Sequence, residues 1–234
     1  VAAAIGGADA RTANPANNDD VAETVREHPA VFRMLADVDS RWSPSHHTAG
    51  AADRLAAETE RTGARGFTLY LGDADDGWLD TAEAAEFFAT AERLGLLAGL
   101  HAPPAWHAAV GRVARRHPDL PLLLHHQGLA TTDQEIDALV ALAAHPGVSV
   151  KVSGFRYVSQ TAAPHADVRP RLERVARAFG PDRLAWGSDW PVSTQHHSYA
   201  DTLAFAADAL SFLDGSELDR VFGGTILSLS PWST

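Results

Sequence analysis

Cysteine is missing from this chain of 234 residues, as are long basic runs and long apolar runs. Without cysteine there are no disulfides, no cysteine-ligated zinc and no thiol nucleophile. No basic run exceeds Arg115-Arg116 and the net charge is −11, which argues against nucleic acid and anionic membrane surfaces as partners. No apolar run approaches the ~18 residues of a membrane span, and no signal peptide is recognisable. We therefore expect a cytoplasmic protein that binds a small molecule and could form a homo-oligomer.

Short apolar runs alternate with amphipathic stretches along the whole sequence, and 45% of the residues are hydrophobic, enough for a large core. The expected strands are 1–5, 31–38, 64–71, 96–101, 120–126, 148–153 and 183–188. The expected helices are 19–27, 52–62, 81–94, 106–116, 132–144, 168–179 and 199–213, with a short one at 217–222. This alternation predicts parallel strands joined by right-handed crossovers in one domain, residues 1–234.

Two α/β architectures have this rhythm. A doubly wound sheet would normally carry a glycine-rich phosphate turn after an early strand, and Ile5-Gly6-Gly7-Ala8 is a poor G-x-G-x-x-G. The sequence therefore favours a (β/α)8 TIM barrel. Only seven strands are counted and the first already starts at Val1, so we expect about seven strand-helix units, with one further unit missing upstream.

Polar residues end four successive expected strands. In a parallel barrel the carboxyl ends of the strands form the active face, so these side chains should meet there. They are His101, the pair His125-His126, Lys151 with Ser153, and Asp189.

Imidazoles beside a carboxylate suit a divalent metal, zinc above all, which lowers the pKa of a bound water. The candidate ligands are His101, His126 and Asp189. Asp189 could instead take the proton from water as a general base, and His101 could be structural. Adjacent strand residues point to opposite faces, so we expect His126 to face the barrel interior and His125 to pack against helices.

Residues 184–191 read L-A-W-G-S-D-W-P and resemble the last-strand W-G-S-D-W-P motif of the amidohydrolase-2 family. This family of TIM-barrel hydrolases and decarboxylases includes 2-pyrone-4,6-dicarboxylate lactonase. Residues 125–128, H-H-Q-G, are similar to its D-H-x-G segment, and residues 150–154, V-K-V-S-G, to its V-K-L-S-G segment. The resemblance runs through essentially the whole chain.

The resemblance implies that Asp189 is a base or metal ligand and that His126 is a ligand or polarises a carbonyl. A guanidinium fork is better suited than an ammonium to hold a substrate carboxylate, so Arg156 is favoured over Lys151 for that role. The candidate substrate contacts are Lys151, Ser153, Arg156 and Trp190. Three aromatic residues near the rim, Trp78, Trp106 and Tyr157, could form an apolar wall or belong to the core.

Two departures from the family pattern matter. The family carries an H-x-H pair on its first strand, and no His-x-His occurs in this sequence. With His101 as a structural residue, two partners are left for a metal, too few for a tight site, so both metal-assisted and metal-free chemistry stay open. Thr68 stands near the position where lactonase-type relatives tend to have an arginine, which predicts a less anionic substrate.

These features predict hydrolysis of a lactone, ester or amide of a small organic molecule by water activated at Asp189. Non-oxidative decarboxylation of an aromatic or unsaturated acid is the alternative within the same superfamily. A truncated or inactive barrel that only binds a ligand is the alternative outside catalysis.

Overall fold

A computed structural model describes residues 2–3 and 17–229 of the chain. They form a sheet of seven parallel strands whose order in space is their order in sequence. The strands are β1 (Ala2–Ala3), β2 (Met34–Asp37), β3 (Gly66–Tyr70), β4 (Leu97–His101), β5 (Leu122–Leu124), β6 (Val148–Val152) and β7 (Leu184–Trp186). The parallel order follows from the strand-helix alternation, because each helix returns the chain to the end where the next strand begins.

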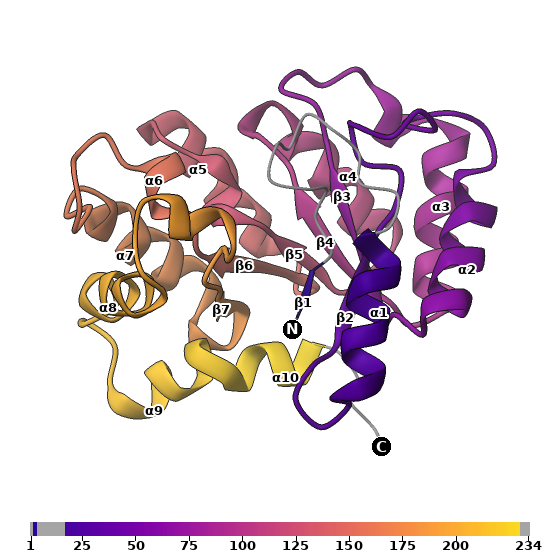
Figure 1. The fold of residues 1–234 in the computed structure, drawn as a ribbon. Helices are drawn as coiled ribbons and strands as arrows, with labels where there is room; N and C mark the ends of the chain where they lie inside the picture. Colours follow the sequence, from indigo (N-terminus) through magenta and orange to yellow (C-terminus); the bar gives the residue numbers. More distant parts are fainter. Residues whose placement is uncertain (1, 4–16, 230–234) are drawn as a thin grey trace.

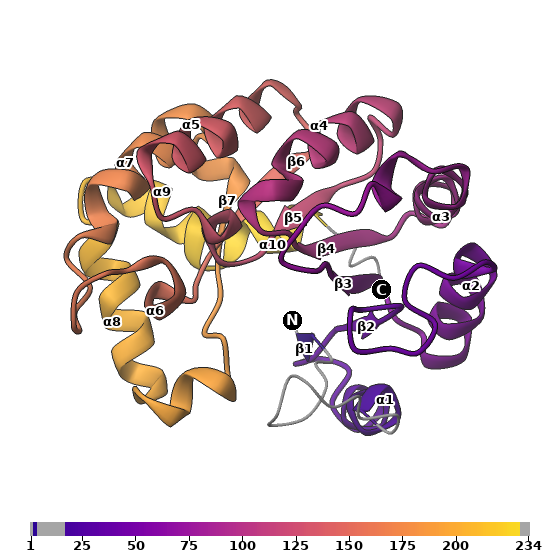
Figure 2. The ribbon, with the colours of Figure 1, turned by 90° about the horizontal axis from the view of Figure 1, so that it is seen from above.

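The sheet is curved, and Figure 2 shows the strands in an arc with the large helices on its outer side. This arrangement is the TIM-barrel fold predicted from the sequence. The helices are α1 (Asn17–Glu27), α2 (Ala51–Thr62), α3 (Ala82–Arg93), α4 (His107–Arg116), α5 (Asp133–Ala141), α6 (Phe155–Val158), α7 (Val168–Phe179), α8 (Tyr199–Ala209), α9 (Gly215–Asp219) and α10 (Thr225–Leu229).

Most expected elements have a counterpart, and the strands are shorter than expected. Of the first expected strand, β1 covers Ala2–Ala3, while residues 1, 4 and 5 lie outside the described part. The fifth strand was expected to extend to residue 126. Instead β5 ends at Leu124, because the backbone turns left-handed at His126. The short helix α6 was not expected, since four residues carry no helical period. Near the C-terminus, α9 and α10 flank a π-helical turn at Arg220–Gly224.

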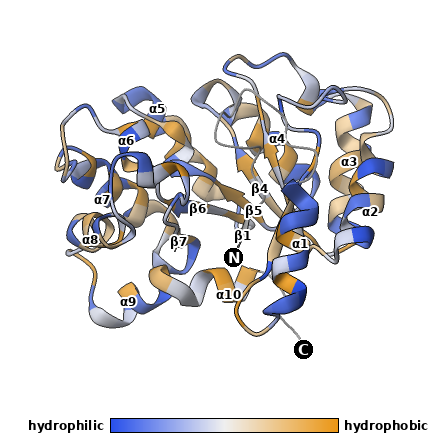
Figure 3. Cartoon of the chain, in the orientation of Figure 1, coloured by the Kyte–Doolittle hydropathy of each residue, from blue (hydrophilic) through white to orange (hydrophobic). Residues whose placement is uncertain are grey.

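Side-chain patterns explain where several helices start and how they face the sheet. Capping boxes begin α5 at Thr132, α8 at Ser198 and α9 at Asp214, each with an acidic residue three positions on that returns a hydrogen bond. Figure 3 shows hydrophobic residues along the central strands and hydrophilic ones on the outer turns of α1 to α3. Among the described residues no helix has the length and apolar character needed to cross a membrane.

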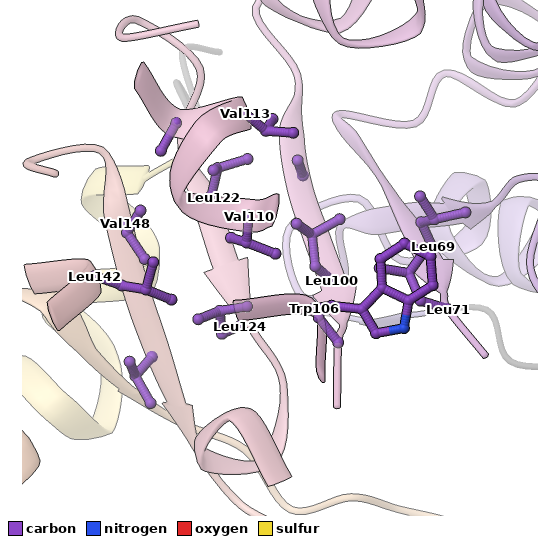
Figure 4. Close-up of a cluster of buried hydrophobic side chains, with 14 of the residues drawn as sticks. Leu69, Leu71, Leu100, Trp106, Val110, Val113, Leu122, Leu124, Leu142 and Val148 are labelled. Carbon is purple, nitrogen blue, oxygen red and sulfur yellow. The ribbon is translucent and has the colours of Figure 1, made fainter. Parts of the chain in front are cut away.

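Apolar side chains cover both faces of the sheet. On the outer face, Leu69 and Leu100 join a large cluster with Trp106, which is fully buried before α4 (Figure 4). On the inner face a small cluster consists of Leu35, Leu97, Leu123 and Ala185, with Ile226 and Leu229 of α10 packed against it. Helix α10 lies below the strands in Figure 1, so the lower interior is filled with hydrocarbon and polar chemistry is left to the opposite end.

Candidate active site at the carboxyl ends of the strands

Strand residues point alternately to the inner and outer faces of the sheet, and this alternation determines which side chains reach the upper interior of the barrel. Residues two or four positions beyond the inner leucines share their face, which places Asp37 above Leu35 on β2 and His101 above Leu97 on β4. The paired register sets Tyr70 of β3 beside His101. Sequence reasoning missed Asp37 and Tyr70 because each is a single polar residue without a motif, although the alternation within its own strand would have located it.

Asp189, Tyr157 and His126 lie close together at this end of the barrel. The Tyr157 hydroxyl donates a 2.8 Å hydrogen bond to Oδ2 of Asp189, and Oδ1 lies 3.7 Å from Nε2 of His126. Asp189 follows β7 in a left-handed conformation, with φ 56°, and its carboxylate contacts residues that follow β5 and β6. Burial raises the pKa of Asp189, while the Tyr157 hydrogen bond and the nearby charge of Lys151 act in the opposite direction.

The expected division of roles between His125 and His126 is wrong. His125 shares the inner face of β5 with Leu123, and an added Cβ on Gly99 would lie 2.9 Å from its Nε2. His125 therefore points into the barrel interior instead of packing against helices. His126 also reaches the site, because the backbone from His126 to Leu129 is left-handed and strand alternation no longer applies. Burial lowers the pKa of both imidazoles well below the usual value, which leaves them neutral at pH 7.

His101 belongs to a row of rings at the rim. Its ring stacks on Tyr70, with centroids 4.7 Å apart, and Tyr70 contacts Trp42 at 4.5 Å. On the other side the His101 ring lies 5.7 Å from that of His126, edge to face. Burial lowers the pKa of His101 to about 4, so this row is uncharged at neutral pH.

Lys151 extends along the inner face of β6. Its side chain accounts for the glycine of the W-G-S-D-W-P motif, Gly187, because it occupies the space that a larger residue there would need. An added Cβ on Gly187 would lie only 2.4 Å from Cε of Lys151. The lysine stem thus passes directly over the backbone of the residue beside it, toward Asp189. Burial lowers the pKa of Lys151, and the carboxylate of Asp189 raises it in part. A larger residue at position 187 would displace this side chain.

The other candidate substrate contacts lie in different surroundings. Arg156 and Asp189 both line a pocket between α6, the segment after β7, and α8, and within the described residues Arg156 forms no ion pair or hydrogen bond. Ser153 is 1% exposed, with its hydroxyl against His126. Trp190 is 65% exposed and is absent from the pocket lining. Trp78 and Trp106 are buried and belong to the core.

Asp37 is a second carboxyl group with a perturbed pKa. It accepts hydrogen bonds from the Ser40 hydroxyl and, at 2.8 Å, from Nε1 of Trp42. Burial is the largest influence and raises its pKa to about 6, although both hydrogen bonds act in the opposite direction. Asp37 thereby orients Trp42, at the end of the ring row.

This raised pKa leads to a testable effect on stability. The folded chain binds the Asp37 proton more tightly than the unfolded chain, whose Asp pKa is about 3.9, so the free energy of unfolding falls as pH rises through about 4 to 6. We expect Asp37→Asn to be more stable than the wild type at pH 7.5, by roughly 3 kcal/mol. This advantage should vanish near pH 4. Urea unfolding at the two pH values measures it, and a destabilised variant at pH 7.5 would contradict the assignment.

The expected metal ligands do not form a ligand group. Across residues 2–3 and 17–229, no three His, Asp or Glu side chains are arranged to hold a metal ion. His126 and Asp189 approach to 3.7 Å, but the His101 ring stays on its stack with Tyr70. The donor set of the described residues therefore does not fit a bound metal, and the site is best described by its hydrogen bonds and charges.

A curved parallel sheet with a carboxylate and imidazoles at the carboxyl ends of its strands defines a TIM-barrel hydrolase-like site. The chain belongs to the amidohydrolase family, whose model matches residues 1–229.

Several relatives with assigned activities are lactone hydrolases. The chain is 34% identical over 219 residues to the L-fucono-1,5-lactonase of Burkholderia ambifaria, an alignment that covers 82% of this chain and 72% of the relative. It is 30% identical over 151 residues to the 4-sulfomuconolactone hydrolase of Hydrogenophaga intermedia, covering 62% of this chain and 48% of that protein. Among solved structures, a zinc-bound amidohydrolase from Burkholderia multivorans superposes with a TM-score of 0.77 and 26% identity, covering 92% of this chain and 79% of the other.

Proposed function

We propose that this chain hydrolyses a lactone of a small organic acid, with Asp189 as the general base. The pair Asp189 and His126 carries the proposal, since Oδ1 and Nε2 lie 3.7 Å apart and frame one reacting position. The other carboxylate oxygen is held by the Tyr157 hydroxyl, so the free oxygen has a fixed direction. Both relatives described above hydrolyse lactones, which supports this choice among esters, amides and lactones.

In the proposed reaction a water oxygen attacks the lactone carbonyl carbon while Asp189 takes one water proton. Negative charge develops on the carbonyl oxygen, beside the neutral His126 ring. The carbon to ring-oxygen bond then breaks, and Asp189 returns the proton to the leaving oxygen. The product is the open hydroxy acid, so atoms and charges balance with water as the only co-reactant.

We propose that Arg156 binds a carboxylate or other polar group of the substrate, because it lines the pocket beside Asp189 without an ion-pair partner in the described part of the chain. Thr68 lies one layer below the rim, where it is fully buried, and Tyr70 takes the rim position of β3. The uncharged Tyr70 ring therefore lies at this position. A cation there, in addition to Arg156, would favour a dicarboxylate substrate. A substrate with at most one anionic group fits this arrangement.

A paired substrate panel tests the proposal. We expect neutral sugar lactones and monoanionic lactones to be opened, with acid release followed by a pH indicator, and aromatic acids to yield no CO2. CO2 release without lactone cleavage would instead support the decarboxylase alternative, and inactivity on both panels would support a ligand-binding barrel. The metal content of the assayed protein should be measured alongside, because the described residues include no group of three side chains arranged to hold a metal ion.

A further inference from the structure

The two ring nitrogens of His126 have different neighbours. Nδ1 lies 3.0 Å from Oγ of Ser153, whereas Nε2 lies 3.7 Å from Oδ1 of Asp189. Ser153 is 1% exposed and His126 is 4% exposed, so bulk water does not compete for the Nδ1 contact. A neutral imidazole carries one proton, on one nitrogen or the other. Its position determines whether the ring can donate or accept a hydrogen bond toward the substrate.

We propose that the Ser153 hydroxyl donates to Nδ1 and thereby fixes the proton of His126 on Nε2. A hydroxyl can donate or accept, so the 3.0 Å contact by itself permits either tautomer. The other side of the ring decides between them. An ionised carboxylate only accepts, so an N–H at Nε2 is attracted to Asp189 and a lone pair at Nε2 is repelled by it.

The glycine after Ser153 leaves room for this contact. An added Cβ on Gly154 would lie 2.5 Å from Nδ1 of His126 and 2.6 Å from Cδ2 of Tyr157. Gly154 also has φ 61°, a left-handed conformation that other residues adopt only with strain. The Ser-Gly pair of the V-K-V-S-G segment therefore has a joint role, in which serine selects the tautomer and glycine allows the ring to approach.

This inference rests on the proposed function and assigns Ser153 as a positioning residue. An N–H at Nε2 gives the site a hydrogen-bond donor where negative charge develops on the lactone carbonyl oxygen. The opposite tautomer would donate from Nδ1 to Ser153 and leave a lone pair at Nε2, which is the arrangement of a metal-ligating histidine. One contact thus distinguishes two chemistries by the position of a single proton.

Long-range 1H–15N spectra of the full chain labelled with 15N-histidine test the proposal directly at pH 7.5. His126 is assigned by its missing signals in His126→Gln. We expect the Nε2–H tautomer in the wild type and a shift toward Nδ1–H in Ser153→Ala. We expect kcat for lactone cleavage to fall by roughly 10- to 100-fold in Ser153→Ala with KM little changed, and Ser153→Thr to restore both the tautomer and kcat.

Ser149→Ala is the matched control. Ser149 lies on the same face of β6 and is also 1% exposed, but its hydroxyl has no hydrogen-bond partner in the described part of the chain. Its removal should leave the His126 tautomer and kcat unchanged. An Nδ1–H tautomer in the wild type, or an unaltered tautomer in Ser153→Ala, would overturn the proposal. Since the spectra need no substrate, a confirmed tautomer in a chain that opens no lactone would refute the proposed function alone.

Discussion

Asp189→Asn is expected to lower kcat/KM for lactone hydrolysis by roughly 10²- to 10⁴-fold, the range for loss of a general base. Asparagine can still accept the Tyr157 hydrogen bond but cannot take a proton from water. Because the native carboxylate is desolvated, the substitution should not destabilise the fold. Steady-state kinetics together with thermal unfolding separate the two effects.

Asp208→Asn provides the matched control, since Asp208 is an exposed carboxylate on α8 and undergoes the same chemical change. It should leave kcat/KM unaltered. The pH profile gives a second check, because activity requires ionised Asp189 and is lost as pH falls through its pKa. Burial raises that pKa, so the acidic decline should begin at a higher pH than for an exposed aspartate. Full activity in Asp189→Asn would rule out the proposed base.

The fold was predictable because its signal is local and repeated. Apolar runs with a polar residue at the end mark strands such as β4, whose expected and observed ends coincide at His101. The same rule placed Asp189 after β7. Strand ends that depend on pairing were less accurate, as in β2, which begins at Met34 and not at residue 31.

The candidate site was only partly predictable because two of its features are not periodic. Strand alternation assigned His125 and His126 to opposite faces, and the left-handed turn at His126 brings both to the site. A turn of this kind depends on tertiary contacts, here including the hydrogen bond from Gln127 Nε2 to the Ser153 carbonyl. The hydrogen bond between Tyr157 and Asp189 joins residues 32 positions apart, and the identity of neither residue indicates which partner it has in the fold.

Trp106→Ala is expected to lower the free energy of unfolding by about 3–5 kcal/mol, the largest stability effect we predict. Trp106 is fully buried, packs near Leu69 and Leu71 in Figure 4, and donates a 2.7 Å hydrogen bond to the Gly72 carbonyl. Its removal leaves a cavity between the sheet and α4 and an unsatisfied carbonyl at the rim. Urea unfolding should show a lower midpoint with an unchanged m-value.

Trp190→Ala is the matched control for Trp106→Ala, because it removes the same side chain from an exposed position. Trp190 has the same side chain but is 65% exposed, so its removal should change the free energy of unfolding by less than about 0.5 kcal/mol. The same variant tests the expected substrate contact, because a raised KM with unchanged stability would place substrate against the indole. Equal destabilisation by the two substitutions would contradict the packing described here, since burial is the property that separates them.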